Sequence, residues 1–203
     1  MNNILISSKI KKNQFGQLTY EIEEGWWNFF RNKKINLLTS NLYSNFNRKF
    51  KSLNISAIIL PGGNNLTQFS KKKVDLLREK IDRKILIYGI KKKIPILGVC
   101  YGFQLIADYY GVRLKKVKNH IKKKHLLDFK TDKLSIKIQV NSFHNYVVNN
   151  LPDYFNEVVK CQDGSIEYAF SQQKKIMCMM FHPERKNNDK LFLKKLVFKF
   201  LNI

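Results

Sequence analysis

The sequence predicts an α/β sandwich with an added antiparallel part, and two patterns carry that prediction. Over residues 1–111, short apolar, β-prone runs alternate with longer stretches whose apolar residues recur every three or four positions. From residue 112 the pattern changes to short strands, followed by one C-terminal helical stretch. Alternating strands and helices are typical of a parallel sheet covered by helices, whereas a run of strands indicates antiparallel pairing.

Four strands and three helices are predicted in the first half. The run SAIIL, which is halted by Pro61-Gly62-Gly63, is wholly apolar, as expected of a strand buried on both faces. Apolar residues three to four positions apart indicate the helices, and Gly111 suits the end of the third. The strands are expected at residues 3–10, 34–40, 56–60 and 94–99, and the helices at 20–33, 70–93 and 103–111.

Six short strands and a closing helix are predicted in the second half. The strands are expected at residues 112–117, 125–129, 135–140, 158–161, 166–170 and 175–181, and the helix at 189–201. The chain shows no internal repeat and no linker long enough to separate domains. A length of 203 residues suits one domain, so we expect residues 1–203 to fold as a single unit.

The composition is that of a globular protein in a reducing compartment. No apolar run approaches the roughly 18 to 20 residues of a membrane helix, and the N-terminal residues lack the pattern of a signal peptide. Cys100, Cys161 and Cys178 are odd in number and lack the CxxC spacing of zinc sites. We therefore expect a cytoplasmic protein that has no disulfide and does not bind membranes.

The chain is strongly basic, with 38 lysine and arginine residues against 15 acidic ones and a formal net charge of +23. A basic face can bind nucleic acid or an anionic small molecule. However, the lysines are spread in short runs, at residues 71–73, 91–93 and 122–124, among many Asn and Ile. This distribution favours solvated lysines in a biased composition, ahead of an anionic substrate. Nucleic acid is not expected as a partner.

Cys100 stands at the centre of Gly98-Val99-Cys100-Tyr101-Gly102, between a predicted strand and a predicted helix. Flanking glycines let such a turn close tightly and hold the central side chain in a strained, exposed position. The positive end of a helix dipole favours a thiolate, and the N–H of Tyr101 is placed to form half of an oxyanion hole. The pentapeptide alone leaves two interpretations open, a nucleophile and a buried structural cysteine.

Two further segments carry the groups that a cysteine nucleophile needs. His182 follows an apolar strand in MMFHPER, and Glu184 stands two residues later, a spacing that places both on one face of a strand. An imidazole can act as the base for a thiol, and a carboxylate can orient it. Gly62 and Gly63 end a buried strand with main chain free of side chains, which suits an N–H presented to an oxyanion. Taken singly, each segment also fits an ordinary strand end or turn.

Three motifs resemble, in order and spacing, those of the class I glutamine amidotransferase superfamily: LPGGN at 60–64, GVCYGFQ at 98–104 and HPE at 182–184. The resemblance extends over essentially the whole chain. It implies a three-layer sandwich with a mostly parallel, flavodoxin-like central sheet and a small antiparallel addition. It also implies that Cys100 attacks a γ-glutamyl carbonyl, that His182 shuttles the proton and that Glu184 orients His182.

The same resemblance implies an oxyanion hole and substrate contacts. The N–H groups of Gly63 and Tyr101 would hold the oxyanion, and Gly62 beside them would contact the substrate. Gln104 falls where the family contacts the α-substituents of the glutamyl group. The segment VNSFHNYVV matches a loop that closes over the glutamate, which implies substrate contacts from Asn141, from the main chain of Ser142 and Phe143, and more weakly from His144.

Within the superfamily, the chain resembles the γ-glutamyl hydrolase (peptidase C26) branch. The segments LLREKIDRK, NSFHNYVV and CQDGSIEYAF are similar to that branch, although Tyr101 replaces an Arg that many members carry. The compact PGGNNLTQFS is similar to members that hydrolyse γ-glutamyl-CDP-amidate to glutamate and cytidine diphosphoramidate. The implied reaction proceeds through a cysteine–glutamyl thioester and needs no metal or organic cofactor. The alternative is a glutaminase subunit that delivers ammonia to a separate synthetase partner.

A substrate that carries a pyrophosphate would give the basic charge a use. The segment NHIKKKH at 119–125 is the first candidate for contacting such an anionic leaving group, and its other interpretation is a solvated loop. His120 and His125 in this segment indicate a metal site only weakly, because the sequence shows no third ligand beside them. We therefore expect no metal ligand in the chain.

Overall fold

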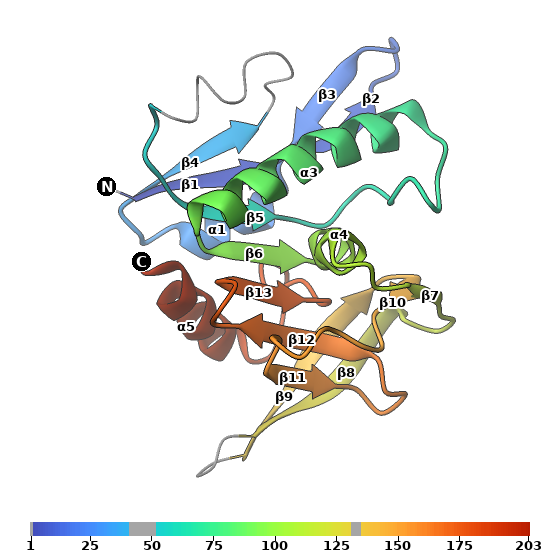
Figure 1. Cartoon of the computed structure of the whole chain (residues 1–203), viewed down its shortest axis with the longest axis vertical. Coiled ribbons are helices and arrows are strands. Elements are labelled where there is room, and N and C mark those ends of the chain that lie inside the picture. Colours follow the sequence, from blue (N-terminus) through green and yellow to red (C-terminus); the bar gives the residue numbers. More distant parts are fainter. Residues whose placement is uncertain (1, 41–51, 131–134) are drawn as a thin grey trace.

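The computed structural model describes residues 2–40, 52–130 and 135–203. Within these ranges, a central sheet of seven strands has the order β11-β12-β13-β6-β5-β1-β4 (Figure 1). Parallel pairing joins β4 (Ile35–Ser40), β1 (Asn2–Ser7), β5 (Ile55–Leu60), β6 (Ile96–Val99) and β13 (Ile176–Met179). Antiparallel pairing then adds β12 (Ile166–Ser171) and β11 (Glu157–Lys160) at one edge. The predicted mostly parallel sheet is confirmed.

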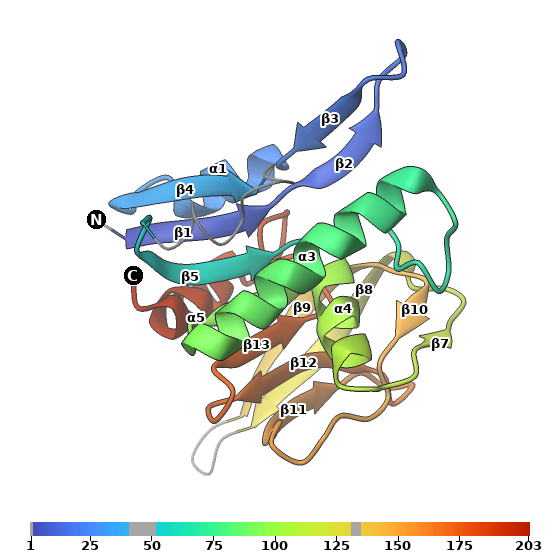
Figure 2. The same cartoon turned by 45° about the horizontal axis from the view of Figure 1, so that its top comes forward.

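Helices cover both faces of this sheet and complete the predicted three layers (Figures 1 and 2). Successive residues of a strand point to opposite faces, and β5 shows this directly, because Ile58 packs in the core with α3 and α4 whereas Ile59 packs with α1 and α5. No helix of the described ranges is both long and apolar enough to span a membrane. The helices are α1 (Glu24–Phe30), α3 (Lys73–Lys92), α4 (Tyr101–Tyr109) and α5 (Lys190–Leu201).

Separate antiparallel pairs are added beside the central sheet, in line with the predicted antiparallel addition, and the largest of them contributes to the core. Leu127, Ile138 and Val140 of the β8–β9 hairpin are buried in the cluster that also holds α1 and α5. The hairpin therefore covers the same face of the sheet as these two helices. The pairs in the described chain are β2 (Lys9–Lys12) with β3 (Leu18–Glu21), β8 (Ile121–Lys130) with β9 (Ser135–Phe143), and β7 (Lys115–Lys116) with β10 (Tyr146–Val147).

Three predicted elements differ from the structure in their bounds. The strand expected at 3–10 is divided at Ser8 into β1 and β2. The helix expected from residue 20 begins only at Glu24, since Tyr20 and Glu21 pair with β2. Trp26 of α1 is still buried, as the apolar spacing predicts. The strand expected at 112–117 is reduced to the two residues of β7, whose partner β10 was not predicted. The partner β10 lies about 30 residues beyond β7, whereas β2 and β3 form a local hairpin whose strand pattern the helical spacing after residue 20 obscures.

Helix α4 starts unusually close to the sheet, and two glycines permit the approach. A Cβ on Gly102 would lie 1.8 Å from the carbonyl oxygen of Leu60, at the end of β5. A Cβ on Gly98 would lie 2.5 Å from the Cδ1 atom of Ile106. The first turn of α4 therefore packs directly against the main chain that leads into Pro61.

We expect Gly102→Ala to destabilise the protein, although alanine is the better helix former by about 1 kcal/mol. The added methyl group meets a main-chain carbonyl, so α4 must move away from β5, and overpacking of this kind costs about 1–3 kcal/mol. The free energy of unfolding, measured by urea denaturation, reports the loss. Gly111→Ala is the control, because its Cβ meets no atom within 4 Å and only its φ of +78° opposes the change. A Gly102→Ala protein more stable than the wild type would contradict the close packing.

Candidate active site

Cys100 lies on a strained turn between β6 and α4, at the carboxyl end of the parallel strands. Its φ of 52° and ψ of −104° are unusual for a residue with a side chain. Two main-chain hydrogen bonds pin this conformation: the Cys100 N–H donates to the Met179 carbonyl at 2.8 Å, and the Gln104 N–H donates to the Cys100 carbonyl at 3.0 Å. The neighbouring strand and the following helix therefore hold the residue in place on a strained turn, as the glycine-flanked motif predicts. The expectation of an exposed side chain is wrong, because Cys100 packs in the buried cluster that also holds α1 and α5 and is only 8% exposed.

His182 and Glu184 lie next to Cys100, and the three side chains form a continuous row. The His182 Nδ1 and the Glu184 Oε1 are 2.6 Å apart, and both residues are buried. His182 follows β13, which is the parallel neighbour of β6, so the ends of the two strands bring His182 to Cys100. The segment 182–185 is a turn closed by the Arg185 N–H and the His182 carbonyl. The strand-face argument for the pair was therefore wrong, and the turn aligns the two side chains instead.

The ring of His182 lies between two acidic partners, which determine its charge. Burial by itself lowers the pKa of His182, but the charges of Glu184 and of the Cys100 thiolate, together with hydrogen bonds to both, raise it to about 10. The imidazole is consequently protonated at neutral pH. A protonated imidazole stabilises a thiolate beside it and can give its proton to a leaving group.

The Pro61-Gly62-Gly63 loop runs directly against this row. A Cβ on Gly62 would lie 2.4 Å from the Cε1 atom of His182, so only glycine fits here. Gly63 has a φ of +133°, a region that favours glycine. Tyr101 is the first residue of α4, so its N–H has no acceptor within the helix. The close packing of α4 on the end of β5 thus gathers the two N–H groups predicted for an oxyanion hole on the same side of the sheet.

Arg78 holds the glycine loop from behind, a role that the sequence did not indicate. Its fully buried guanidinium donates to the Pro61 carbonyl at 2.9 Å and the Gly62 carbonyl at 3.4 Å, and it pairs with Asp82 at 2.7 Å. In a trans peptide the C=O and the next N–H point in opposite directions. A Gly62 carbonyl held by Arg78 therefore turns the Gly63 N–H away from Arg78. The available signal was the Arg–Asp pair four residues apart, beside the apolar face of the predicted helix.

Gln104 and Asn141 are brought to the site, and each is bonded to main chain. The Gln104 Nε2 donates to the Tyr146 carbonyl at 3.0 Å, which ties α4 to the loop predicted to close over the substrate. The Asn141 side chain donates to the His182 carbonyl and accepts from the His182 N–H, both at 2.9 Å. In this structure Asn141 therefore positions the main chain of His182. A substrate contact by either residue stays a prediction.

The next three residues of the loop point in different directions. Phe143 is partly exposed, and its ring centroid lies 6.2 Å from that of His182, at the mouth of the site. Ser142 is buried and donates to the His120 carbonyl at 2.5 Å. His144 is also buried and faces Glu167. Of these three side chains, only that of Phe143 lies beside the Cys100–His182–Glu184 row, and the main-chain contacts expected of Ser142 and Phe143 stay a prediction.

Arg185 was also missed by the sequence analysis, and it fastens the turn that carries His182. Its guanidinium makes two hydrogen bonds to the Glu23 carboxylate, at 2.7 and 2.9 Å, and lies 5.0 Å from the centre of the Phe143 ring. The hydrogen bond from Arg185 lowers the pKa of Glu23 despite the partial burial of this carboxyl. The turn is thus anchored to the residue that precedes α1.

The segment 119–125 lies beside this loop, because β8 pairs with β9 through Lys123↔Ser142 and Lys124↔Asn141. The side chains of residues 122–124 are exposed, so they form a basic rim next to the strand that reaches His182. His120 and His125 instead lie close to His144 and Glu167. The sequence argument against a metal site relied on the lack of a third ligand, and the structure supplies both a third and a fourth donor.

Comparisons with known proteins agree with this geometry. The family model of class I glutamine amidotransferases matches residues 17–201. The γ-glutamyl-CDP-amidate hydrolase of Campylobacter jejuni is 33% identical over 133 residues, which are 66% of this chain and 64% of that protein. The glutamine-hydrolyzing GMP synthase of Acetivibrio thermocellus is 33% identical over 144 residues, which are 67% of this chain and 26% of that protein. The chain thus spans just under two thirds of the first relative and about a quarter of the second.

A solved structure shows the same fold at low sequence identity. A glutamine amidotransferase from Thermotoga maritima superimposes with a TM-score of 0.66 at 18% identity, covering 98% of this chain and 82% of that one. The fold, the three motifs and the match over residues 17–201 lead to one conclusion. The chain belongs to the class I glutamine amidotransferase family.

Proposed function

We propose that this protein is a cysteine hydrolase of γ-glutamyl amides and that its substrate is γ-glutamyl-CDP-amidate. The observation that carries the proposal is the row of Cys100, His182 and Glu184 on a strained turn beside the glycine loop. A nucleophile, a base and an orienting carboxylate in contact are the minimum set for acyl transfer through cysteine. Membership of the amidotransferase family makes the γ-glutamyl carbonyl the expected point of attack.

The proposed reaction has two halves. In the first, the Cys100 thiolate adds to the γ-carbonyl carbon, and the N–H groups of Gly63 and Tyr101 stabilise the oxyanion. Protonated His182 gives its proton to the leaving nitrogen as the C–N bond breaks, which leaves a glutamyl thioester on Cys100. In the second half, neutral His182 takes a proton from water, which attacks the thioester. Glutamate leaves, and the thiolate and the protonated imidazole are regenerated.

The choice of leaving group is supported by the relative and by charge. The Campylobacter protein named for this substrate is 33% identical over the matched region, and residues 122–124 place three exposed lysines beside the substrate loop. A pyrophosphate group is a suitable partner for such a rim. The match to a GMP synthase favours the second candidate, a glutaminase that supplies ammonia to a synthetase.

The decisive experiment compares glutamate release from γ-glutamyl-CDP-amidate and from glutamine by the purified protein. We expect the nucleotide amide to be the better substrate by kcat/KM, and Cys100→Ser to abolish its hydrolysis because a hydroxyl is a far weaker nucleophile. Cys178→Ala, which removes a buried thiol in β13, is the control and should retain activity. Faster hydrolysis of glutamine, or turnover only with an added synthetase, would support the second candidate instead. An active Cys100→Ser protein would overturn the mechanism.

The charge of His182 predicts how activity depends on pH. Its pKa is raised from 6.5 to about 10, so the acid needed for the first half is present at neutral pH and is lost as the pH rises through about 10. Glu184→Gln removes the charge that contributes most to this rise, so we expect the alkaline limb of the kcat/KM profile to move to lower pH. The same alkaline limb in both proteins would show that His182 is not the acid.

The favourable charge contacts of His182 also contribute to stability, with the same sign. They stabilise the folded protein fully below the unfolded pKa of about 6.5, and their contribution is lost as the pH rises through the folded pKa of about 10. The free energy of unfolding should therefore fall across this range by less in Glu184→Gln than in the wild type, which urea denaturation at several pH values can measure.

The basic rim is tested by neutralising it. We expect the triple change of Lys122, Lys123 and Lys124 to Gln to raise KM for the nucleotide amide by at least about threefold, since three exposed ion pairs of about 0.2–1 kcal/mol each contribute at least about 0.6 kcal/mol together. Added salt should raise the wild-type KM through screening. The control is the same triple change at residues 91–93, also exposed, which lie at the end of α3 remote from Cys100. Equal KM values in the wild type and both triple variants would show that Lys122, Lys123 and Lys124 do not contact the substrate.

A further inference from the structure

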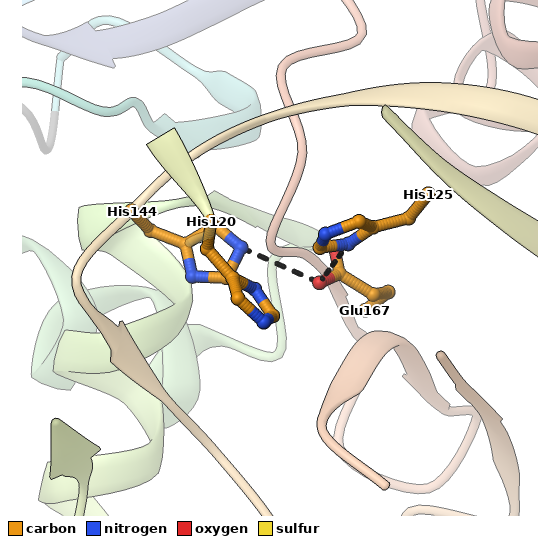
Figure 3. A group of neighbouring side chains, drawn as sticks. All are labelled: His120, His125, His144 and Glu167. Atoms are coloured by element: carbon orange, nitrogen blue, oxygen red, sulfur yellow. Dashed lines mark hydrogen bonds and ion pairs between the residues drawn. The ribbon is translucent and has the colours of Figure 1, made fainter. Parts of the chain in front are cut away.

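Three histidines and one glutamate form a compact group apart from the Cys100–His182–Glu184 row (Figure 3). One donor atom from each of His120, His125, His144 and Glu167 lies within 4.8 Å of the others. His120 and His125 flank the start of β8, His144 follows β9, and Glu167 lies in β12. The group therefore joins the β8–β9 hairpin to the central sheet.

The donor side chains are mostly buried, and several of their polar atoms have no hydrogen-bond partner in the described part of the chain. Glu167 is fully buried, and His120 and His144 are nearly so. Within the described part of the chain, the His120 Nδ1 and the Glu167 Oε2 are buried without a hydrogen-bond partner. The His144 Nε2 has only the Glu167 Oε1 nearby, at 3.3 Å, and the His125 Nδ1 shares that oxygen at 2.8 Å. Buried polar atoms without partners are costly, so this group calls for a ligand.

The outer nitrogens of two histidines are occupied in a way that directs the inner ones at this group. The His120 Nε2 lies 2.8 Å from the Asp163 carboxylate, and the His144 Nδ1 lies 3.2 Å from the Tyr146 carbonyl. An acceptor at the outer nitrogen keeps the proton there and leaves the lone pair of the inner nitrogen free. Metal-binding histidines are held in this manner, by a carboxylate or a carbonyl behind the ring.

The donor set selects the kind of metal. Imidazole nitrogen and carboxylate oxygen suit Zn²⁺, whereas Ca²⁺ and Mg²⁺ prefer oxygen alone. Zinc bonds of about 2.0–2.1 Å place tetrahedral ligands about 3.3 Å apart, a separation that falls between the 2.8 Å of the closest pair and the 4.8 Å limit of the group. Four protein ligands leave no open position, which is typical of a structural site.

We propose that His120, His125, His144 and Glu167 form a structural Zn²⁺ site. The ion would cross-link β8, the end of β9 and β12, and so hold the loop that carries Asn141 and Phe143 against the Cys100–His182–Glu184 row. The link to that loop is direct, since the Ser142 hydroxyl donates to the His120 carbonyl and Asn141 bonds the main chain of His182. This site is independent of the substrate assigned above.

The test uses the tag-free full chain, treated with a chelator, dialysed and titrated with ZnCl₂ in a calorimeter. We expect one Zn²⁺ per chain, a higher melting temperature with zinc, and a Co²⁺-loaded protein with the strong visible absorption of a tetrahedral site. His125→Ala removes a ligand and should weaken zinc binding by at least tenfold. His182→Asn is the matched control and should bind zinc as the wild type does, because His182 lies outside the four.

A second variant keeps the test sharp if His125→Ala does not fold. Asp163→Asn replaces the partly exposed carboxylate behind His120, and loss of such a partner weakens metal binding by about 10- to 100-fold. The other oxygen of Asp163 accepts from Ser165 and Cys161, and the amide oxygen of Asn can keep these bonds. Wild-type protein that binds no zinc at micromolar concentrations would overturn the proposal and leave a hydrogen-bonded histidine cluster in its place. Equal zinc affinity in the wild type and in Asp163→Asn would overturn it too, as would loss of zinc in His182→Asn alone.

Discussion

The close packing of α4 against the end of β5 is the constraint on which the site depends. With no Cβ at Gly102, the first turn of the helix reaches the carbonyl of Leu60, and the chain must then reverse at Cys100 through a strained conformation. Cys100 thereby joins the end of β6 to α4, whose first residue, Tyr101, has an N–H without an acceptor in the helix. Because β13 is the parallel neighbour of β6, His182 emerges at the same edge.

A buried guanidinium supports this arrangement from inside the fold. The Arg78 guanidinium is fully buried, and the ion pair with Asp82 and the hydrogen bonds to the carbonyls of the glycine loop offset the cost of its desolvation. A buried ion pair adds little net stability compared with apolar packing, but removal of one partner is costly. Its value here is positional, because it fixes the peptide planes of residues 61–63 while α3 covers the sheet.

Three sets of hydrogen bonds hold the segments around the Cys100–His182–Glu184 row in place. Asn141 clamps the main chain of His182, Arg185 ties the following turn to Glu23, and Gln104 holds the loop at Tyr146. Two successive side chains at the end of β9 point to different sites, the candidate active site and the histidine group. Phe143 faces His182, whereas His144 faces Glu167. One short segment therefore connects the candidate active site to the histidine group.

Elements that depend on neighbouring residues can be predicted from the sequence alone. Buried strands appear as apolar runs, α3 and α5 appear as periodic patterns, and the glycines around Cys100 mark a turn because no other residue fits so tight a bend. The family resemblance added the expected roles of the residues in the three motifs. Its prediction of a mostly parallel sheet with antiparallel additions is confirmed.

Which distant groups meet depends on how the elements pack. Periodicity reports which face of an element is buried, not what it is buried against. The sequence therefore predicted only that Arg78 lies in a helix, and the fold shows that its guanidinium donates to the Gly62 carbonyl. His120 and His125 likewise lacked further ligands in the sequence, because His144 and Glu167 reach them only through pairing of β8 with β9 and the packing of this hairpin beside β12.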